Sequence, residues 1–221
     1  MLRKIAKPYI DKYKLYYLLH FTHKRNINSI LERGILSKNE LKRHGIRYIS
    51  IADEKVQAIR NNIEFHLKGH IIKSLHDCVP LYISWRTPTL FKILQRENIQ
   101  RQDIIHILVD TYKILDKNYC FTDGNAASYS TKQYILIENL DRLDWNTIKK
   151  DNWGWGKDRD ELKRKKNAEF LVYPKIELKD FYQIVVFDEK TKKEIEKTLR
   201  KYSVELKVRV DKRYYTWPQH Y

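Results

Sequence analysis

Apolar residues recur along the chain at two different spacings, and each spacing predicts one kind of secondary structure. The segment "VELKVRV" at 204–210 alternates strictly between apolar and polar positions, which is the pattern of a strand with one buried face. Short apolar runs that favour buried strands occur at 13–22, 79–85, 104–109, 133–137, 168–174 and 183–187. The chain is therefore predicted to be built mainly on strands.

Helical spacing is present in four other segments. Within 23–36 the apolar residues recur every three to four positions, and Gly34 stands where a helix would end. The same spacing predicts an amphipathic helix over 54–68, a short helix around 90–97 and a helix over 191–202.

The order of these elements predicts the fold class. Strands outnumber helices, and the helices cluster early and late instead of following every strand, which is an α+β pattern. The length of 221 residues fits one domain. Residues 141–167 hold three Trp, two Gly and many charges, and they predict a long irregular loop. Such a loop inside a compact domain is usually functional or disordered.

The charge balance favours a polyanionic partner. The chain has 44 Lys and Arg against 28 Asp and Glu, a formal net charge of +16. Its 16 Tyr and 5 Trp exceed what a core of this size needs, and rings beside cations form stacking platforms for unpaired bases. A lysine-rich surface that only solvates the protein is the alternative. A membrane surface fits less well, because no long basic amphipathic helix is present.

Cysteine usage and hydropathy bear on the location of the protein. Cys78 and Cys120 form no CxxC pair, so neither a disulfide framework nor a cysteine zinc site is supported. No apolar run approaches the ~20 residues of a membrane span. The first residues, "MLRKIAKPYI", lack the apolar region of a secretory signal. We therefore expect a cytoplasmic protein without a membrane partner.

Four histidines are candidates for a metal site. His20 and His23 lie where a predicted strand meets a predicted helix, and His66 and His70 are four apart in a predicted helix. A metal site needs three or four ligands, no Cys or acidic residue accompanies the first pair, and the HExxH pattern is absent. We expect no metal, and keep a metalloenzyme built on these histidines as an alternative.

Two further segments are candidates for ligand contact. In "FTDGNAASYST" at 121–131, Asp-Gly marks a turn, and the small residues after it leave room for a flat ligand or another backbone. In "CVPLYISWRTPTLF" at 78–91, Arg86 follows a strand and either binds phosphate or caps the strand at the surface.

The acid in "RKKNAEFLVYP" at 164–174 raises the most specific question. Alternation places Glu169 on one strand face with Leu171 and Tyr173, where burying a carboxylate is costly unless its charge is needed. The cations at 164–166 would favour its ionised form if they lie near it. An edge acid paired with these cations and an acid held for chemistry both fit the spacing.

Five blocks together resemble the DarT family of DNA ADP-ribosyltransferase toxins. They are "LLHFTHKRNINSIL", "DCVPLYISWRTPTLF", "CFTDGNAA", "LDWNTI" with a later Trp, and "KKNAEFLV", in the family's order from about Leu15 to Phe187. The resemblance implies an ADP-ribosyltransferase fold of the diphtheria-toxin and PARP group, in which a split β core with flanking helices holds NAD in a cleft. The motif-bearing core at about 15–187 would form a single domain, 1–221, with a helix-strand extension at 188–221.

The resemblance also implies a reaction and partners. Family members attach ADP-ribose from NAD to a base of single-stranded DNA, usually thymine and in some branches guanine, and a macrodomain antitoxin, DarG, removes the mark. We therefore expect a monomeric toxin that uses NAD as co-substrate and has single-stranded DNA and a DarG-like antitoxin as partners. Modification of guanine, RNA or a protein, and a catalytically silent nucleic-acid-binding module, are the alternatives.

Motif position implies the roles of individual residues. Glu169 matches the catalytic glutamate, and Arg60 in "QAIRNN" is the best match to the catalytic arginine, with Arg47 as the second choice. His23 in "FTH" matches the NAD-contacting histidine, and the expected cofactor contacts also include His20, Thr22, Asn26 and Arg60. The acceptor-recognition loop of this fold precedes the glutamate, so the expected DNA contacts are Trp153, Trp155, Lys163, Arg164, Lys165, Lys166 and Arg86. Inward packing of the two Trp as a plug is the alternative for them.

Two ligand-facing segments depart from the family pattern. The sequence "TPTL" stands where Pro-Met-Leu usually follows the arginine after the third strand, and Asn125 stands where a His follows "TDG". These departures bear on the base that is modified more than on the reaction class. In that reaction, cleavage between nicotinamide and ribose builds positive charge on the ribose carbon, which a fixed carboxylate stabilises. The same Glu169 can remove the imide proton of thymine as a general base.

Overall fold

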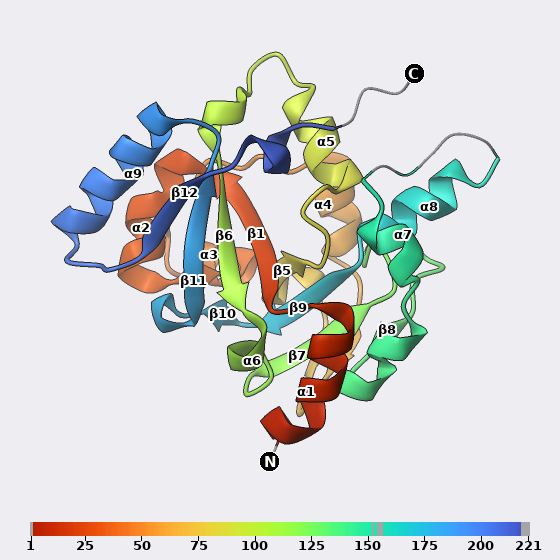
Figure 1. The fold of residues 1–221 in the computed structure, drawn as a ribbon. Coiled ribbons are helices and arrows are strands. Elements are labelled where there is room, and N and C mark those ends of the chain that lie inside the picture. Colours follow the sequence, from red (N-terminus) through yellow and green to blue (C-terminus); the bar gives the residue numbers. More distant parts are fainter. Residues whose placement is uncertain (1, 152, 154–156, 218–221) are drawn as a thin grey trace.

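The computed structural model describes residues 2–151, 153 and 157–217, and its centre is an eight-stranded sheet (Figure 1). In order across the sheet the strands are β12 (Lys207–Val210), β11 (Phe181–Val186), β6 (Ile104–Asp110), β1 (Tyr17–His23), β5 (Val79–Tyr82), β9 (Glu169–Tyr173), β7 (Asn118–Thr122) and β8 (Gln133–Tyr134). Neighbouring strands are antiparallel except β11 and β12, which are parallel. Two small pairs accompany the sheet: β2 (Ile35–Leu36) with β10 (Lys175–Ile176), and β3 (Phe65–Leu67) with β4 (His70–Ile72).

The sheet is split between β1 and β5. β1 pairs with β6 over seven residues, whereas it pairs with β5 through one Cα pair, Leu19 with Tyr82. Figure 1 shows β6 and β1 running steeply and β9 and β7 crossing them at a large angle. A split β core with flanking helices is therefore confirmed, as is the α+β class.

The helices flank both halves of the sheet. They are α1 (Leu2–Tyr13), α2 (Ile27–Arg33), α3 (Lys38–Arg43), α4 (Glu54–Arg60), α5 (Pro88–Leu94), α6 (Thr111–Ile114), α7 (Trp145–Lys149), α8 (Arg159–Lys166) and α9 (Glu189–Lys201). In the described part of the chain, none of them is long and apolar enough to cross a membrane.

The alternation of β9 buries both of its faces. Phe170 and Val172 join the main core, while Leu171 packs in a smaller core with Cys78 and Cys120. Both cysteines are free thiols. Glu169 therefore begins a strand with no solvent-facing side, which is why its carboxylate needs a partner inside the protein.

The predicted end of the helix at Gly34 is confirmed. Gly34 is the C-cap of α2 with φ 81°, a left-handed conformation that favours glycine. A Cβ at this position would overlap the carbonyl oxygen of Ile176 in β10. This close approach lets β2 pair with β10 beside the core.

The segments beyond Phe187 are joined to the core. β12 lies parallel to β11, and α9 connects them and contacts α2. The buried Tyr215 donates its hydroxyl to the carbonyl oxygens of Ile104 and Val185, at 3.0 and 2.9 Å. These bonds fix the C-terminal segment across β6 and β11.

Three predicted elements were wrong in extent. The helix expected over 54–68 ends at Arg60, and β3 follows, because Phe65 and Leu67 alternate toward the core as strand residues. The strand expected at 133–137 is two residues long. The irregular loop expected at 141–167 contains α7 and α8. The pattern also gave no prediction of α1, α3 or β7.

Candidate active site

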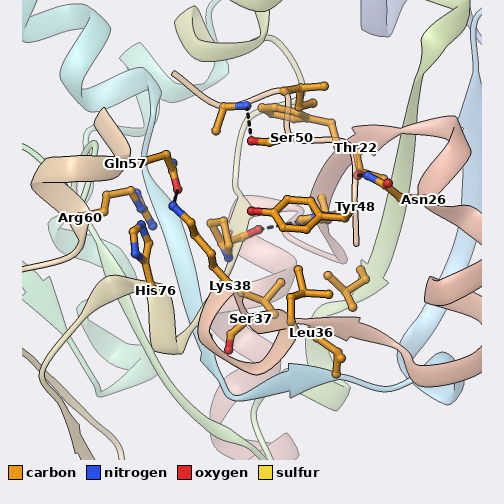
Figure 2. A pocket seen from close by; sticks show the side chains of 18 of the residues that line it. Thr22, Asn26, Leu36, Ser37, Lys38, Tyr48, Ser50, Gln57, Arg60 and His76 are labelled. Atoms are coloured by element: carbon orange, nitrogen blue, oxygen red, sulfur yellow. Dashed lines mark hydrogen bonds between the residues drawn. The ribbon is translucent and has the colours of Figure 1, made fainter. Parts of the chain in front are cut away.

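A cavity of about 260 Å³ lies at the split between β1 and β5 (Figure 2). β1 contributes His20 and Thr22 to its wall, and β5 contributes Pro80 and Tyr82. Nδ1 of His20 lies 3.2 Å from the carbonyl oxygen of Pro80 and bridges the two strands where they no longer pair. Most of the remaining wall comes from α2, α3, α4, α5 and the segments 46–53 and 75–78. Divergence of two neighbouring strands thus forms the cavity.

Glu169 and Arg60 form a buried ion pair beside this cavity. Nη1 and Nη2 of Arg60 lie 3.1 and 3.3 Å from Oε1 and Oε2 of Glu169, a bidentate arrangement. The two residues are 7% and 1% exposed, and Arg60 lines the cavity. Glu169 is therefore neither an edge acid nor a partner of the cations at 164–166. It is held by an arginine 109 residues away in the sequence.

Arg60 reaches this position as the last residue of α4. Asp53 caps the start of the helix by accepting from the backbone N–H groups of Lys55 and Val56, and Ser74 Oγ contacts the Arg60 carbonyl at 3.4 Å. Burial lowers the pKa of the Arg60 guanidinium, but attraction and hydrogen bonds to Glu169 outweigh burial, and the pKa is raised. The guanidinium is therefore positively charged at any pH at which the protein folds.

The turn after β7 holds the other side of the carboxylate. The backbone N–H of Ala126 donates to Oε1 of Glu169 at 2.9 Å. Thr122 Oγ1 donates to the carbonyl oxygen of Gly124 and receives the N–H of Glu169, at 2.7 and 3.3 Å. A side chain at Gly124 would overlap Arg164, so the Asp-Gly turn is closed tightly. The small residues of 121–131 therefore leave room for another part of the chain, because the Glu169 carboxylate packs against them.

The expected cofactor residues do not all face the cavity. His20, Thr22 and Asn26 line it, and Asn26 donates to Thr22 Oγ1 and to the carbonyl oxygen of Ile49, each at 3.0 Å. His23 is not among the lining residues, and its Nδ1 accepts the N–H of Arg25 at a helix start. The contact between His23 and NAD therefore stays a prediction, whereas His20 and Thr22 line the cavity in this structure.

The cavity also contains polar residues that sequence reasoning missed. Nζ of Lys38 lies 3.3 Å from Oε1 of Gln57, and Figure 2 shows it beside Arg60 and His76. Burial and the positive charges of Lys38 and Arg60 lower the pKa of His76 to about 4, so its imidazole is neutral at pH 7. Tyr48 enters the cavity from the facing segment (Figure 2). No local pattern marks these residues, because they meet only after folding.

The second choice for the catalytic arginine lies elsewhere. Arg47 is exposed and does not line the cavity. The alternative of a metal site has no support in the described ranges. They contain no group of three or more His, Cys, Asp or Glu side chains that could hold a metal ion. His66 and His70 lie on the β3–β4 hairpin instead of a helix.

Most of the residues expected to contact DNA are buried or bonded to other residues of the protein. Trp153 is buried and packs inward. Its ring and that of Phe91 meet edge to face, with their centroids 5.3 Å apart. Lys166 is fully buried, and its Nζ contacts Ser84 Oγ and the carbonyl oxygens of Ile148 and Lys150. Burial also lowers the pKa of Lys166 to about 8. Both side chains are buried in this structure, and their contact with DNA stays a prediction.

The other residues expected to contact DNA differ in their exposure and in their ion pairs. Arg164 pairs with Asp123 and Glu161, each at 2.7 Å, and Lys165 pairs with Asp144 at 3.1 Å. Arg86 is largely buried, donates to the carbonyl oxygen of Arg213 at 3.1 Å and pairs with Asp151. Lys163 is partly exposed and pairs with Asp160 at 3.3 Å. Trp155 lies outside the described residues.

Comparison with known proteins gives one consistent family. The sequence model described as "ssDNA thymidine ADP-ribosyltransferase, DarT" matches residues 19–216. A DNA ADP-ribosyl transferase from Thermus sp. (strain 2.9) is 30% identical over 191 residues, covering 84% of this chain and 88% of that protein. A transferase–glycohydrolase fusion protein from Thermosipho africanus is 29% identical over 191 residues, covering 84% of this chain and 45% of the fusion.

Solved structures agree with the sequence comparisons. The Thermus sp. 2.9 protein in complex with ADP-ribosylated single-stranded DNA superposes with a TM-score of 0.82 at 25% identity, covering 92% of this chain and 97% of that chain. Its complex with NAD+ gives a TM-score of 0.76 at 24% identity over 92% and 98% of the chains. The family match extends past Phe187 and includes α9 and β12.

Proposed function

The chain belongs to the DarT family of single-stranded DNA thymidine ADP-ribosyltransferases, and from this premise we propose that Glu169 and Arg60 are its catalytic pair. The protein is an ADP-ribosyltransferase that uses NAD as co-substrate. Its acceptor is a base of single-stranded DNA, thymine in the family description. The roles of individual residues below are proposals.

The observation that carries the proposal is the bidentate Arg60–Glu169 contact at the cavity wall. A buried ion pair is costly to desolvate, so it is weak evidence for a stabilising role. Replacing both partners with apolar residues of similar volume would often be neutral or stabilising. The retention of both charges next to a cavity supports a chemical role.

Glu169 is proposed to act on both reactants. NAD supplies a ribose carbon that gains positive charge as the bond to nicotinamide breaks, and a fixed carboxylate stabilises that charge. The same carboxylate is proposed to accept the proton of the acceptor base, which is typically worth ~10²- to 10⁴-fold in rate. Because the N–H of Ala126 donates to Oε1, the carboxylate has a fixed orientation in both roles.

Arg60 is proposed to orient the carboxylate and to contact an anionic or planar part of a reactant. Its planar fork occupies both oxygens of Glu169, a geometry that lysine cannot reproduce. General-base action requires that one of these contacts open, since the carboxylate oxygens already accept hydrogen bonds from Arg60 and Ala126. We propose that binding of the reactants causes this opening.

The donor set of the cavity fits a dinucleotide. Nε2 of His76 is buried without a hydrogen-bond partner among the described residues, and it lies beside Lys38 and Arg60. Cationic side chains next to a neutral imidazole suit a phosphate or an amide group. His20, Thr22 and Asn26 are proposed to contact the co-substrate from the β1 side.

The biological setting completes the proposal. We propose that the protein is a cytoplasmic, monomeric toxin whose mark is removed by a glycohydrolase antitoxin of the DarG type. Support comes from the relative in which both activities are fused in one chain. The two buried free cysteines are compatible with a reducing compartment.

One assay tests the function. The protein is incubated with NAD and, separately, with single-stranded DNA, RNA and protein pools, and ADP-ribosyl mass shifts are measured. We expect a mass shift on DNA, retained in guanine-free strands and lost in thymine-free strands. Modification that follows guanine would assign the departures at Asn125 and "TPTL" to base choice, and modification of protein alone would contradict the proposal.

A further inference from the structure

We propose that a second groove, on the far side of the β1–β5 junction from the cavity, binds the single strand outside the acceptor base. Its volume is about 160 Å³. The two cavities are lined by the same two chain segments on either side of the single Leu19–Tyr82 pair: β1 contributes Tyr17, and the extension of β5 contributes 83–85. This proposal rests on the proposed function and adds the path of the substrate strand.

The walls of the groove include four partly buried aromatic rings. They are Tyr13 at the end of α1, Tyr17 on β1, Trp85 after β5 and Trp145 on α7. Tyr13 and Trp145 stack at a centroid distance of 4.1 Å and an interplanar angle of 8°. Exposed ring faces bind unpaired bases of any sequence, typically in a groove of positive charge.

Two lysines on the rim have no acidic partner among the described residues, although the Tyr13 hydroxyl donates to the exposed carboxylate of Asp141 at 2.6 Å. Lys14 and Lys149 are exposed, and no carboxylate of the described residues lies within 4.0 Å of either. Nζ of Lys149 lies 5.8 Å from the Tyr13 ring centroid and 5.6 Å from that of Trp145. Lys163 and Lys165 on α8 are in ion pairs with Asp160 and Asp144, whereas Lys14 and Lys149 are available to phosphates. The occupant that fits is a polyanion with flat apolar groups, which is single-stranded DNA.

The groove is connected to the catalytic strand by direct bonds. The N–H of Ile83, in the groove wall, donates to the carbonyl oxygen of Ala168 at 3.1 Å, and Ala168 directly precedes Glu169. Nζ of the buried Lys166 also contacts Ser84 Oγ and the Ile148 carbonyl oxygen, at 3.2 and 3.1 Å, and both residues line the groove.

The directions of the side chains on β5 and β9 determine how long a DNA strand must be to reach the groove. Ile83 and Ala168 point into the main core, whereas Glu169 and its neighbour Tyr82 point to the other face. A DNA strand that reaches both the groove and the cavity is expected to pass around the end of β5. The groove is therefore expected to contribute only to oligonucleotides that extend beyond the acceptor.

Charge reversal at Lys149 tests this path. The transfer rate is measured with single-stranded DNA of about 3 and about 12 nucleotides, the latter within the site sizes usual for such grooves. Lys149→Glu should raise KM for the long strand roughly 5- to 10-fold and leave KM for the short strand and for NAD unchanged. The slope of log affinity against log salt should also fall by about 0.7. The matched control is Lys197→Glu, with the same charge change on the exposed face of α9.

Three outcomes would overturn the proposal. Equal effects of Lys149→Glu and Lys197→Glu would show only a general charge effect. An equal loss with short and long strands would place Lys149 at the acceptor. Unchanged DNA kinetics with lost affinity for the purified antitoxin would make the groove a protein interface. Failure of the proposed function is distinguishable, because then the parental chain modifies neither strand.

A photochemical experiment locates the strand independently of kinetics. 5-Iodouracil is placed at successive positions on either side of a single thymine, and crosslinked peptides are identified by mass spectrometry. Crosslinks to Tyr17, Trp85 or Trp145 at a fixed offset from the thymine would support the groove. Crosslinks at every offset to other surfaces would overturn it.

Discussion

Arg60 and Glu169 meet through two parallel N–H···O contacts of 3.1 and 3.3 Å, although 109 residues separate them in the sequence. One partner ends a short helix and the other begins a buried strand, so the contact joins the cavity wall to the central sheet. Truncating either residue would leave the other charge buried and unpaired, at a cost of about 3 to 5 kcal/mol. Variants that keep size and hydrogen bonding therefore test chemistry better than alanine.

Arg60→Lys should lower the transfer rate on the order of 100-fold, because the ammonium group keeps the charge but cannot engage both carboxylate oxygens. Steady-state kinetics with saturating NAD and DNA would measure this. Arg47→Lys is the matched control, since Arg47 is exposed and away from the cavity, and it should retain the parental rate. The opposite ranking of the two variants would move the role to Arg47.

His20→Ala should raise KM for NAD roughly tenfold, as expected for the loss of one polar contact in a cavity. His23→Ala should stay near the parental value, because His23 does not line the cavity and its Nδ1 only caps a helix start. Titration calorimetry with NAD separates the two variants. Weaker binding in His23→Ala alone would support the assignment made from motif position.

The stability of the protein should rise with pH between about 4 and 6.5 in part through His76. Its imidazole titrates near pH 6.5 in the unfolded chain and only near pH 4 in the folded protein, so the unfolded state binds more protons in this window. His76→Gln should remove this part of the rise in the midpoint of thermal unfolding. Other buried histidines, such as His106, contribute in the same direction, so the difference between variant and parent is the measured quantity. Identical pH profiles would show that His76 titrates normally in the folded state.

Lys166 should make stability rise with pH between about 8 and 10.4, because burial lowers its pKa to about 8 in the folded protein only. Lys166→Met should remove this rise, whereas Lys163→Met, on the more exposed side of α8, should keep it. Thermal unfolding of both variants from pH 7.5 to 10.5 would show the difference. A parallel response of the two variants would argue against a buried, charged Lys166.

Local sequence patterns were sufficient to predict some elements of the fold. The alternation of β9 identified the strand that carries Glu169, and the apolar spacing before Gly34 identified α2 and its end. The motif order selected Arg60 and Glu169 as candidates, and the structure brings these two side chains together. These features depend on neighbouring residues, which a sequence displays directly.

Other parts depend on contacts that no local pattern displays. The spacing over 54–68 stays helical through Ile63 and Leu67, but pairing of β3 with β4 draws the second half into a strand. Lys38 and His76 come from segments without a motif and meet Arg60 only when the sheet splits. Charge alone likewise could not show that Lys166 is buried.

The most direct test of the catalytic pair is the rate of ADP-ribosyl transfer by Glu169→Gln with NAD and a thymine-containing single strand. Glutamine keeps the size of the side chain and can still accept the Ala126 N–H, but it carries no charge and cannot serve as a base. We expect transfer to fall at least ~100-fold, with an unchanged far-ultraviolet circular dichroism spectrum and unchanged affinity for the strand. Transfer at the parental rate by a folded Glu169→Gln protein would contradict the central claim that this carboxylate performs the chemistry.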